Sequence, residues 1–179
     1  RKATLGQMLT SLASAGWDEP RIFAEPRTPI PEAFAHLPRT QHDEVLGAFP
    51  NWYLALTEMV MREPDVDAFL LCQDDVTIAA GLRRYLELEL WPAPDVGVVS
   101  VYCPSHYAVD RVSGFQVEDR GWGTWGAMAY IFPNRSARAL LCDPLVLAHR
   151  SAGPHRGIRN IDSVVGDWCR RSGSPYFVH

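Results

Sequence analysis

Two adjacent carboxylates, Asp74 and Asp75, follow a largely apolar run at residues 66–72. A short run of this kind predicts a buried β-strand that ends just before the acids. Two neighbouring acids repel each other, and burying either one is costly unless a cation or hydrogen bonds compensate. The pair therefore indicates a site for a divalent cation such as Mg²⁺, which prefers carboxylate oxygens. Gln73 adds a polar side chain at the same strand end.

Two other interpretations of the acid pair stay open. Asp75 lies close enough to Thr77 to help cap a helix beginning there, and Asp residues often cap helices. A strand-end acid pair is also typical of magnesium phosphatases and phosphotransferases. Those enzymes separate their two acids by one residue, whereas these two are adjacent, so this second interpretation is disfavoured.

The segment from Gly121 to Gly126 combines three glycines with Trp122 and Trp125. Indole rings stack on sugar rings, and glycine lets the backbone approach a ligand closely. We therefore expect Trp125 and Gly126 to contact a substrate. The alternative is a turn whose tryptophans anchor in the core.

A basic segment, residues 155–159, contains Arg156 together with a histidine and a second arginine. Arg156 is a candidate to bind a diphosphate or an acidic acceptor, because guanidinium groups pair well with phosphate and carboxylate oxygens. The alternative is a solvated basic loop.

The surrounding chain alternates helix and strand patterns. Apolar spacing predicts a first helix that ends near Gly16, a helix capped by Asn51 that closes near Pro64, and a helix that begins at Thr77. Further helices are expected at residues 135–142 and 162–171. Short apolar or β-branched runs predict the strands, at residues 21–25, 66–72, 96–102, 127–132 and 176–178.

Strands without hydrophobic alternation, separated by amphipathic helices, indicate an α/β fold with a mostly parallel sheet flanked by helices. In such folds ligands bind beyond the carboxyl ends of the strands, where Asp74 and Asp75 are expected to lie. The chain has 179 residues, of which 47% are hydrophobic and 21% charged, so we expect a single globular domain over residues 1–179.

The amino-acid composition also limits the classes of partner and the cellular location that we expect. A net charge of −4 argues against nucleic acid, which requires clustered Lys and Arg. No apolar stretch reaches the roughly 20 residues that span a bilayer, and no leader pattern opens the chain, so we expect a cytoplasmic protein without a transmembrane segment. The four cysteines lack CxxC spacing, which favours free, mostly buried thiols.

Four segments, in their order along the chain, resemble the motifs of GT-A-fold glycosyltransferases, especially the family 2-like group: residues 51–56, 67–76, 126–133 and 161–162. The resemblance covers most of the chain and implies a GT-A (Rossmann-like) domain. It also implies a first strand before Arg1, so we expect this domain to be trimmed at both ends.

The resemblance implies a metal-dependent glycosyltransferase that takes a sugar from a nucleotide-sugar donor to a hydroxyl of a carbohydrate or other acceptor. Mn²⁺ or Mg²⁺ would bridge the donor diphosphate to the protein. Asp75 and Asp74 would be its ligands, and His179 would add a late histidine ligand, unless it is simply an exposed terminal residue. Asn51, Gln73 and Asp74 would contact the donor.

The same resemblance assigns Asp162 the role of general base in an inverting transfer, in which a late carboxylate deprotonates the acceptor hydroxyl. The rival interpretation is that Asp162 caps the helix over residues 163–171. Inversion and retention both stay open, and retention would remove this role. The alternative function is a catalytically silent nucleotide-sugar or carbohydrate-binding module of the same fold.

Overall fold

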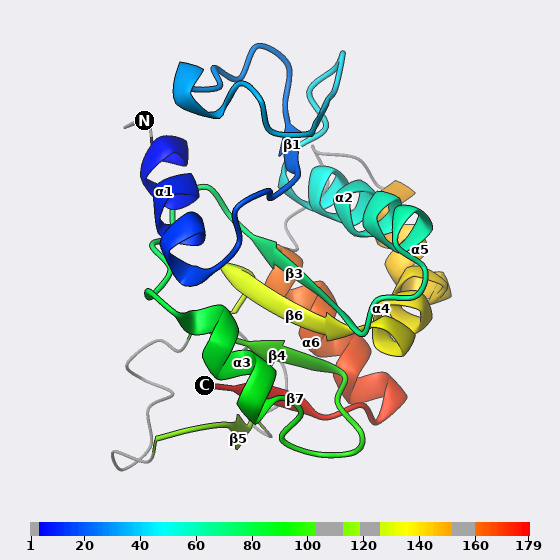
Figure 1. The fold of residues 1–179 in the computed structure, drawn as a ribbon. Helices are drawn as coiled ribbons and strands as arrows, with labels where there is room; N and C mark the ends of the chain where they lie inside the picture. Colours follow the sequence, from blue (N-terminus) through cyan, green and yellow to red (C-terminus); the bar gives the residue numbers. More distant parts are fainter. Residues whose placement is uncertain (1–3, 103–112, 119–125, 152–159) are drawn as a thin grey trace. The chain divides into compact units, whose positions relative to one another are not determined.

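The computed structural model describes residues 4–102, 113–118, 126–151 and 160–179 (Figure 1). The chain forms two compact units that are both discontinuous in sequence. The first unit comprises Arg1–Val45 and Gln73–Pro92, and the second comprises Leu46–Cys72 and Ala93–His179. Helices and strands are interspersed along the described chain, which confirms the predicted α/β class. None of the helices in the described ranges has the length and apolar content that a membrane crossing requires.

The first unit begins with helix α1, Leu5–Ala15, which ends at Gly16 as predicted. Gly16 has a φ of 110°, in the left-handed region that glycine tolerates best. Strand β1, Ile22–Ala24, pairs in parallel with β2, Arg39–Gln41. The proline-rich connection between them contains one short 3₁₀ helix, Glu32–Phe34, and is otherwise irregular, as its prolines predict.

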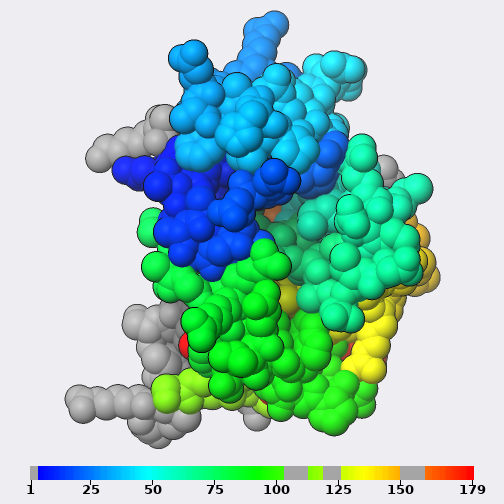
Figure 2. Space-filling model, viewed as in Figure 1, coloured from blue at the N-terminus to red at the C-terminus, as the bar shows by residue number. Residues whose placement is uncertain are grey.

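Helix α3, Leu82–Glu89, begins later than the sequence predicted. Gly81 precedes it with a φ of 73°, so its backbone cannot continue a right-handed helix backwards to Thr77. The Ile78 amide instead donates a hydrogen bond of 3.0 Å to Ser11 Oγ on α1. Residues 77–81 therefore run along α1, and the two segments lie side by side on the surface of this unit (Figure 2).

In its described residues, the second unit holds the main sheet and four helices. The helices are α2, Ala48–Arg62, α4, Asn134–Leu141, α5, Pro144–Ser151, and α6, Ile161–Ser172. The strands are β3, Ala68–Cys72, β4, Val98–Ser100, β5, Gln116–Val117, β6, Ala129–Pro133, and β7, Tyr176–Val178. The sequence predicted all of these elements except β5 and α5.

The strand order of this sheet is β3-β6-β4-β7-β5. In the described part of the sheet only β4 and β7 pair in parallel, and the other pairs are antiparallel. The prediction of a mostly parallel sheet is therefore wrong, because the sheet is mixed. Strand β6 is five residues long and buried throughout, and such a fully apolar strand gives the same sequence pattern in either direction.

Because β3 and β4 both run antiparallel to β6, and β4 runs parallel to β7, the strands β3, β4 and β7 point the same way. Their carboxyl ends therefore meet at one edge of the sheet, together with the amino end of β6. The register places Cys72 opposite Ala129, and Ser100 opposite both Tyr130 and Val178. We call this side of the sheet the carboxyl edge.

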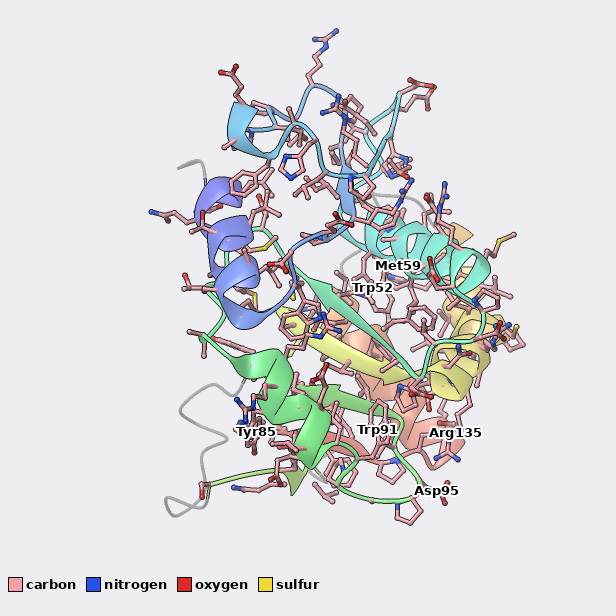
Figure 3. All side chains as sticks on the ribbon, in the orientation of Figure 1. Trp52, Met59, Tyr85, Trp91, Asp95 and Arg135 are labelled. Atoms are coloured by element: carbon pink, nitrogen blue, oxygen red, sulfur yellow. The ribbon has the colours of Figure 1, made fainter. Side chains whose placement is uncertain are left out.

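The core of the second unit lies where helices cover the sheet. Trp52 of α2 packs on Phe132 of β6 with ring centroids 5.9 Å apart, and Tyr130 meets Phe132 edge to face. Both sheet residues are fully buried. Helix α4 is fixed at its start by Arg135, whose guanidinium lies 3.1 Å from Asp95 (Figure 3). Apolar packing therefore holds the helices on the sheet, and the exposed Arg135–Asp95 pair lies at the opposite edge, where β6 ends and β4 begins.

Candidate functional site

Asp162 lies in the first turn of α6 but does not cap this helix. The N-cap is Asn160, whose Oδ1 accepts hydrogen bonds from the amide of Ser163 at 3.0 Å and from its hydroxyl at 2.7 Å. The capping interpretation of Asp162 is therefore wrong, because an asparagine two residues earlier has that role. This leaves the Asp162 carboxylate for other contacts.

Those contacts bring together segments far apart in the sequence. Oδ1 of Asp162 accepts a hydrogen bond of 2.7 Å from the amide of Ala127 and one of 3.3 Å from the hydroxyl of Tyr130. Ala127 lies two residues before the start of β6, and Tyr130 lies within it. Asp162 therefore lies at the carboxyl edge and fixes the chain where it enters the central antiparallel strand.

A second tyrosine extends this arrangement into the core. The hydroxyl of Tyr176 on β7 donates to the hydroxyl of Tyr130 at 3.2 Å, and the two rings meet edge to face. Burial raises the pKa of Tyr130 well above its ordinary value, and the neighbouring Tyr176 and Asp162 raise it further. Burial also raises the pKa of Tyr176. Both phenols therefore stay protonated and act as neutral donors. We call Tyr176, Tyr130 and Asp162 the tyrosine–aspartate chain.

Gly126 is positioned by packing against the same edge. A Cβ atom placed there would collide with the Tyr176 hydroxyl and with the side chain of Ser100. The Ser100 Oγ also lies 3.3 Å from the Gly126 carbonyl oxygen. Close packing is thus enough to require glycine here, and its predicted contact with a substrate stays a prediction.

His179 follows β7 and lies at the carboxyl edge. Its backbone amide donates to the Ser100 carbonyl oxygen at 3.0 Å, and its exposed imidazole packs edge to face on Phe115, with centroids 4.9 Å apart. The sequence prediction placed this histidine after a strand, which is confirmed. Its role as a metal ligand stays a prediction.

Asp74 and Asp75 follow β3 after Gln73 in the chain but belong to the first unit, whereas Asp162 and His179 belong to the second. Both acids are exposed and Gln73 is half-buried, so the pair does not carry the cost of burial that the sequence suggested. Across the described residues, no three His, Cys, Asp or Glu side chains cluster as a metal site would require. Two carboxylates still fit Mg²⁺ or Mn²⁺, since Mg²⁺ usually binds one or two carboxylates together with water and substrate phosphates.

The remaining candidate residues have different outcomes. Asn51 lies inside α2 rather than at its cap, because the helix begins at Ala48 after Gly47 and the Asn51 amide donates to the Gly47 carbonyl. Trp125 and Arg156 lie outside the described residues. Three cysteines in the described ranges are free: Cys169 is buried, Cys72 is half-buried and Cys142 is exposed.

Sequence reasoning missed Tyr130 and Tyr176 as polar members of the site. Both occur within apolar strand patterns, which predict a strand and no polar role. The only signal was their hydroxyl groups, which a buried tyrosine normally directs to a partner.

No protein-family model matches the sequence, and no curated protein matches it.

Proposed function

We propose that this protein is a metal-dependent glycosyltransferase of GT-A type that transfers a sugar from a nucleotide-sugar to an acceptor hydroxyl with inversion. The observation that carries the proposal is the placement of Asp162 at the carboxyl edge, where β3, β4 and β7 all end. Strand β3 leads directly into the Asp74-Asp75 pair. Ligands of α/β sheets bind beyond the carboxyl ends of strands, which favours a substrate site at this edge.

In the proposed reaction Asp162 is the general base. The acceptor hydroxyl gives its proton to the Asp162 carboxylate while its oxygen forms a bond to the anomeric carbon of the donor sugar. The bond from that carbon to the diphosphate breaks, and the nucleoside diphosphate leaves with the bonding electron pair. The hydrogen bonds from Ala127 and Tyr130 to Oδ1 hold the carboxylate in place for this proton transfer.

Asp75 and Asp74 would hold the metal ion, with His179 as a further ligand. When bound, Mn²⁺ or Mg²⁺ neutralises negative charge on the departing diphosphate. The protein's own contribution is the pair of carboxylates, which are hard oxygen ligands suited to such an ion. The residues proposed to contact the donor or the acceptor are Asn51, Gln73, Asp74, Trp125, Gly126 and Arg156.

Calorimetry with a nucleoside diphosphate tests the donor site. We expect UDP or GDP to bind in the presence of Mn²⁺ and to bind much more weakly after the metal is chelated. In Asp75→Ala, we expect Mn²⁺ no longer to increase the affinity for the nucleoside diphosphate. Asp65→Ala is a matched control, because Asp65 is an exposed acid in a turn that precedes β3. Nucleoside diphosphate binding that is equal with and without metal would contradict the proposed site.

Calorimetry with simple sugars separates the carbohydrate-binding form of the alternative function, whereas the absence of donor turnover separates a silent nucleotide-sugar-binding module. A catalytically silent carbohydrate-binding module would bind simple sugars without metal and would not distinguish Asp75→Ala from the control. A donor site predicts the opposite pattern.

A further inference from the structure

We infer that Tyr130 is a positioning residue for Asp162: its hydroxyl, supported by Tyr176, fixes the orientation of the carboxylate that removes the acceptor proton. This role rests on the proposed function of Asp162. The contact itself is a hydrogen bond of 3.3 Å from a fully buried phenol to a half-buried carboxylate.

Geometry distinguishes this phenol from ordinary core tyrosines. Oδ1 of Asp162 receives two donors, the Ala127 amide and the Tyr130 hydroxyl, from positions three residues apart at the start of β6. Two donors on one oxygen restrict rotation of the carboxylate about its last side-chain bond. These two donors therefore help to set the direction of its other oxygen.

Tyr176 sets the direction of the hydrogen bonds in the tyrosine–aspartate chain. Its hydroxyl donates to the Tyr130 oxygen at 3.2 Å, so the Tyr130 proton is directed away from Tyr176 and towards Asp162. Among the described residues, the titratable groups in and around the tyrosine–aspartate chain come from three elements. They are Tyr130 on β6, Tyr176 on β7, and Asp162 and Cys169 on α6. Burial raises the pKa of both phenols and of the Cys169 thiol, so all three groups remain neutral near pH 7.

A kinetic comparison of two buried tyrosines tests the inference. Tyr53 of α2 is also buried, and its hydroxyl donates to the Leu141 carbonyl at 2.8 Å, so Tyr53→Phe removes a buried hydrogen bond that has no contact with Asp162. In a donor and acceptor assay with Mn²⁺, we expect Tyr130→Phe to lower kcat about tenfold, the cost of one lost hydrogen bond, with KM for the donor unchanged. Tyr53→Phe should leave kcat unchanged. Equal effects of the two substitutions on kcat would overturn the inference.

A spectroscopic experiment requires neither turnover nor a Tyr130 variant. Tyrosine labelled with ¹³C at the ζ carbon gives one resonance per residue, and the Tyr130 resonance should move in Asp162→Asn more than that of Tyr53. A Tyr130 resonance that does not move would overturn the inference. If it moves while no nucleotide-sugar is consumed by the unmodified protein, the coupling of Tyr130 to Asp162 is supported and the proposed transferase function is contradicted.

Discussion

The amide of Ala127 donates a hydrogen bond of 2.7 Å to Oδ1 of Asp162, joining the entry of β6 to the first turn of α6 across 35 positions of sequence. The same oxygen accepts from Tyr130, whose side chain is fully buried. Asp162 therefore has a structural role in addition to any chemical one. The two roles can be separated because the structural role needs only a hydrogen-bond acceptor.

Replacing Asp162 by alanine and by asparagine should have different effects on stability. Asp162→Ala leaves the buried Tyr130 hydroxyl and the Ala127 amide without this acceptor, and we expect a loss of about 1–3 kcal/mol in the free energy of unfolding. Asp162→Asn keeps an acceptor oxygen and should lose clearly less. Urea unfolding followed by circular dichroism measures both values. Equal losses would show that the hydrogen bonds to Oδ1 do not stabilise the fold.

Gly126→Ala should destabilise the protein, because the added methyl group would collide with Tyr176 and Ser100 in a well-packed region. Overpacking of this kind typically costs about 1–3 kcal/mol. Gly6→Ala is the matched control: its nearest contact is an ordinary 3.5 Å to Pro31 and it lies inside helix α1, where alanine is preferred. Thermal unfolding should show a lower Tm for Gly126→Ala and an equal or higher one for Gly6→Ala. A Gly126→Ala protein as stable as the control would show that the surrounding side chains can move to accommodate the added methyl group.

An ion-pair cluster predicts how stability depends on pH. Arg171 pairs with both oxygens of Asp143, at 2.9 and 3.0 Å, and its Nε lies 2.8 Å from Asp167. Its hydrogen bonds hold the pKa of Asp143 below the ordinary value, and hydrogen bonds from Arg171 and Arg170 do the same for Asp167. A carboxyl whose pKa is lower in the folded state stabilises the protein above its unfolded pKa, about 3.9, and this contribution disappears as the pH falls below it.

Arg171→Met should therefore reduce the loss of stability between about pH 5 and pH 2, measured by urea unfolding at a series of pH values. Glu87→Gln is the control, since Glu87 pairs with Arg83 in a strongly exposed helical pair, and such pairs contribute little. If the free energy of unfolding depends on pH with the same slope in the unmodified protein and in Arg171→Met, the ion pairs of Arg171 do not account for the loss of stability in acid.

Thiol reactivity should follow burial. Burial raises the pKa of Cys72 and of Cys169 to about 12, whereas Cys142 is exposed. Because the thiolate is the reactive form, iodoacetamide at pH 8 should label Cys142 well before the other two under native conditions. Peptide mass spectrometry gives the order, with Cys142→Ser as a control. Labelling of Cys72 as fast as that of Cys142 would contradict the raised pKa of the Cys72 thiol.

Local structure followed closely from sequence because the signals are local. The end of α1 near Gly16 and the strand that ends at Cys72 follow from apolar spacing that stops at a glycine and from an apolar run. The start of α3 was wrong, since Gly81 and the Ile78 contact to Ser11 were invisible to periodicity. Strand direction in the sheet was also wrong, because pairing partners are distant in sequence.

At the candidate site, too, the sequence predicts local features but not the contacts between residues that are distant in sequence. Sequence placed Asp162 at the start of a helix, but choosing between cap and base required the position of Asn160, two residues earlier, and of Ala127 across the sheet. The contribution of Tyr130 depends on a contact between β6 and α6 that no spacing rule encodes. The acid pair was predicted from residue type alone, and its exposure emerged only from the structure.

The central claim is that Asp162 is the base of a nucleotide-sugar transferase, and donor consumption by Asp162→Asn tests it most directly. A panel of nucleotide-sugars with Mn²⁺ would be incubated with the unmodified protein, with Asp162→Asn and with Asp65→Asn as a surface control. We expect the unmodified protein and the control to release nucleoside diphosphate from at least one donor, and Asp162→Asn to be about 100-fold slower or more, as for loss of a general base. No release from any donor by the unmodified protein, or full activity in Asp162→Asn, would contradict the account.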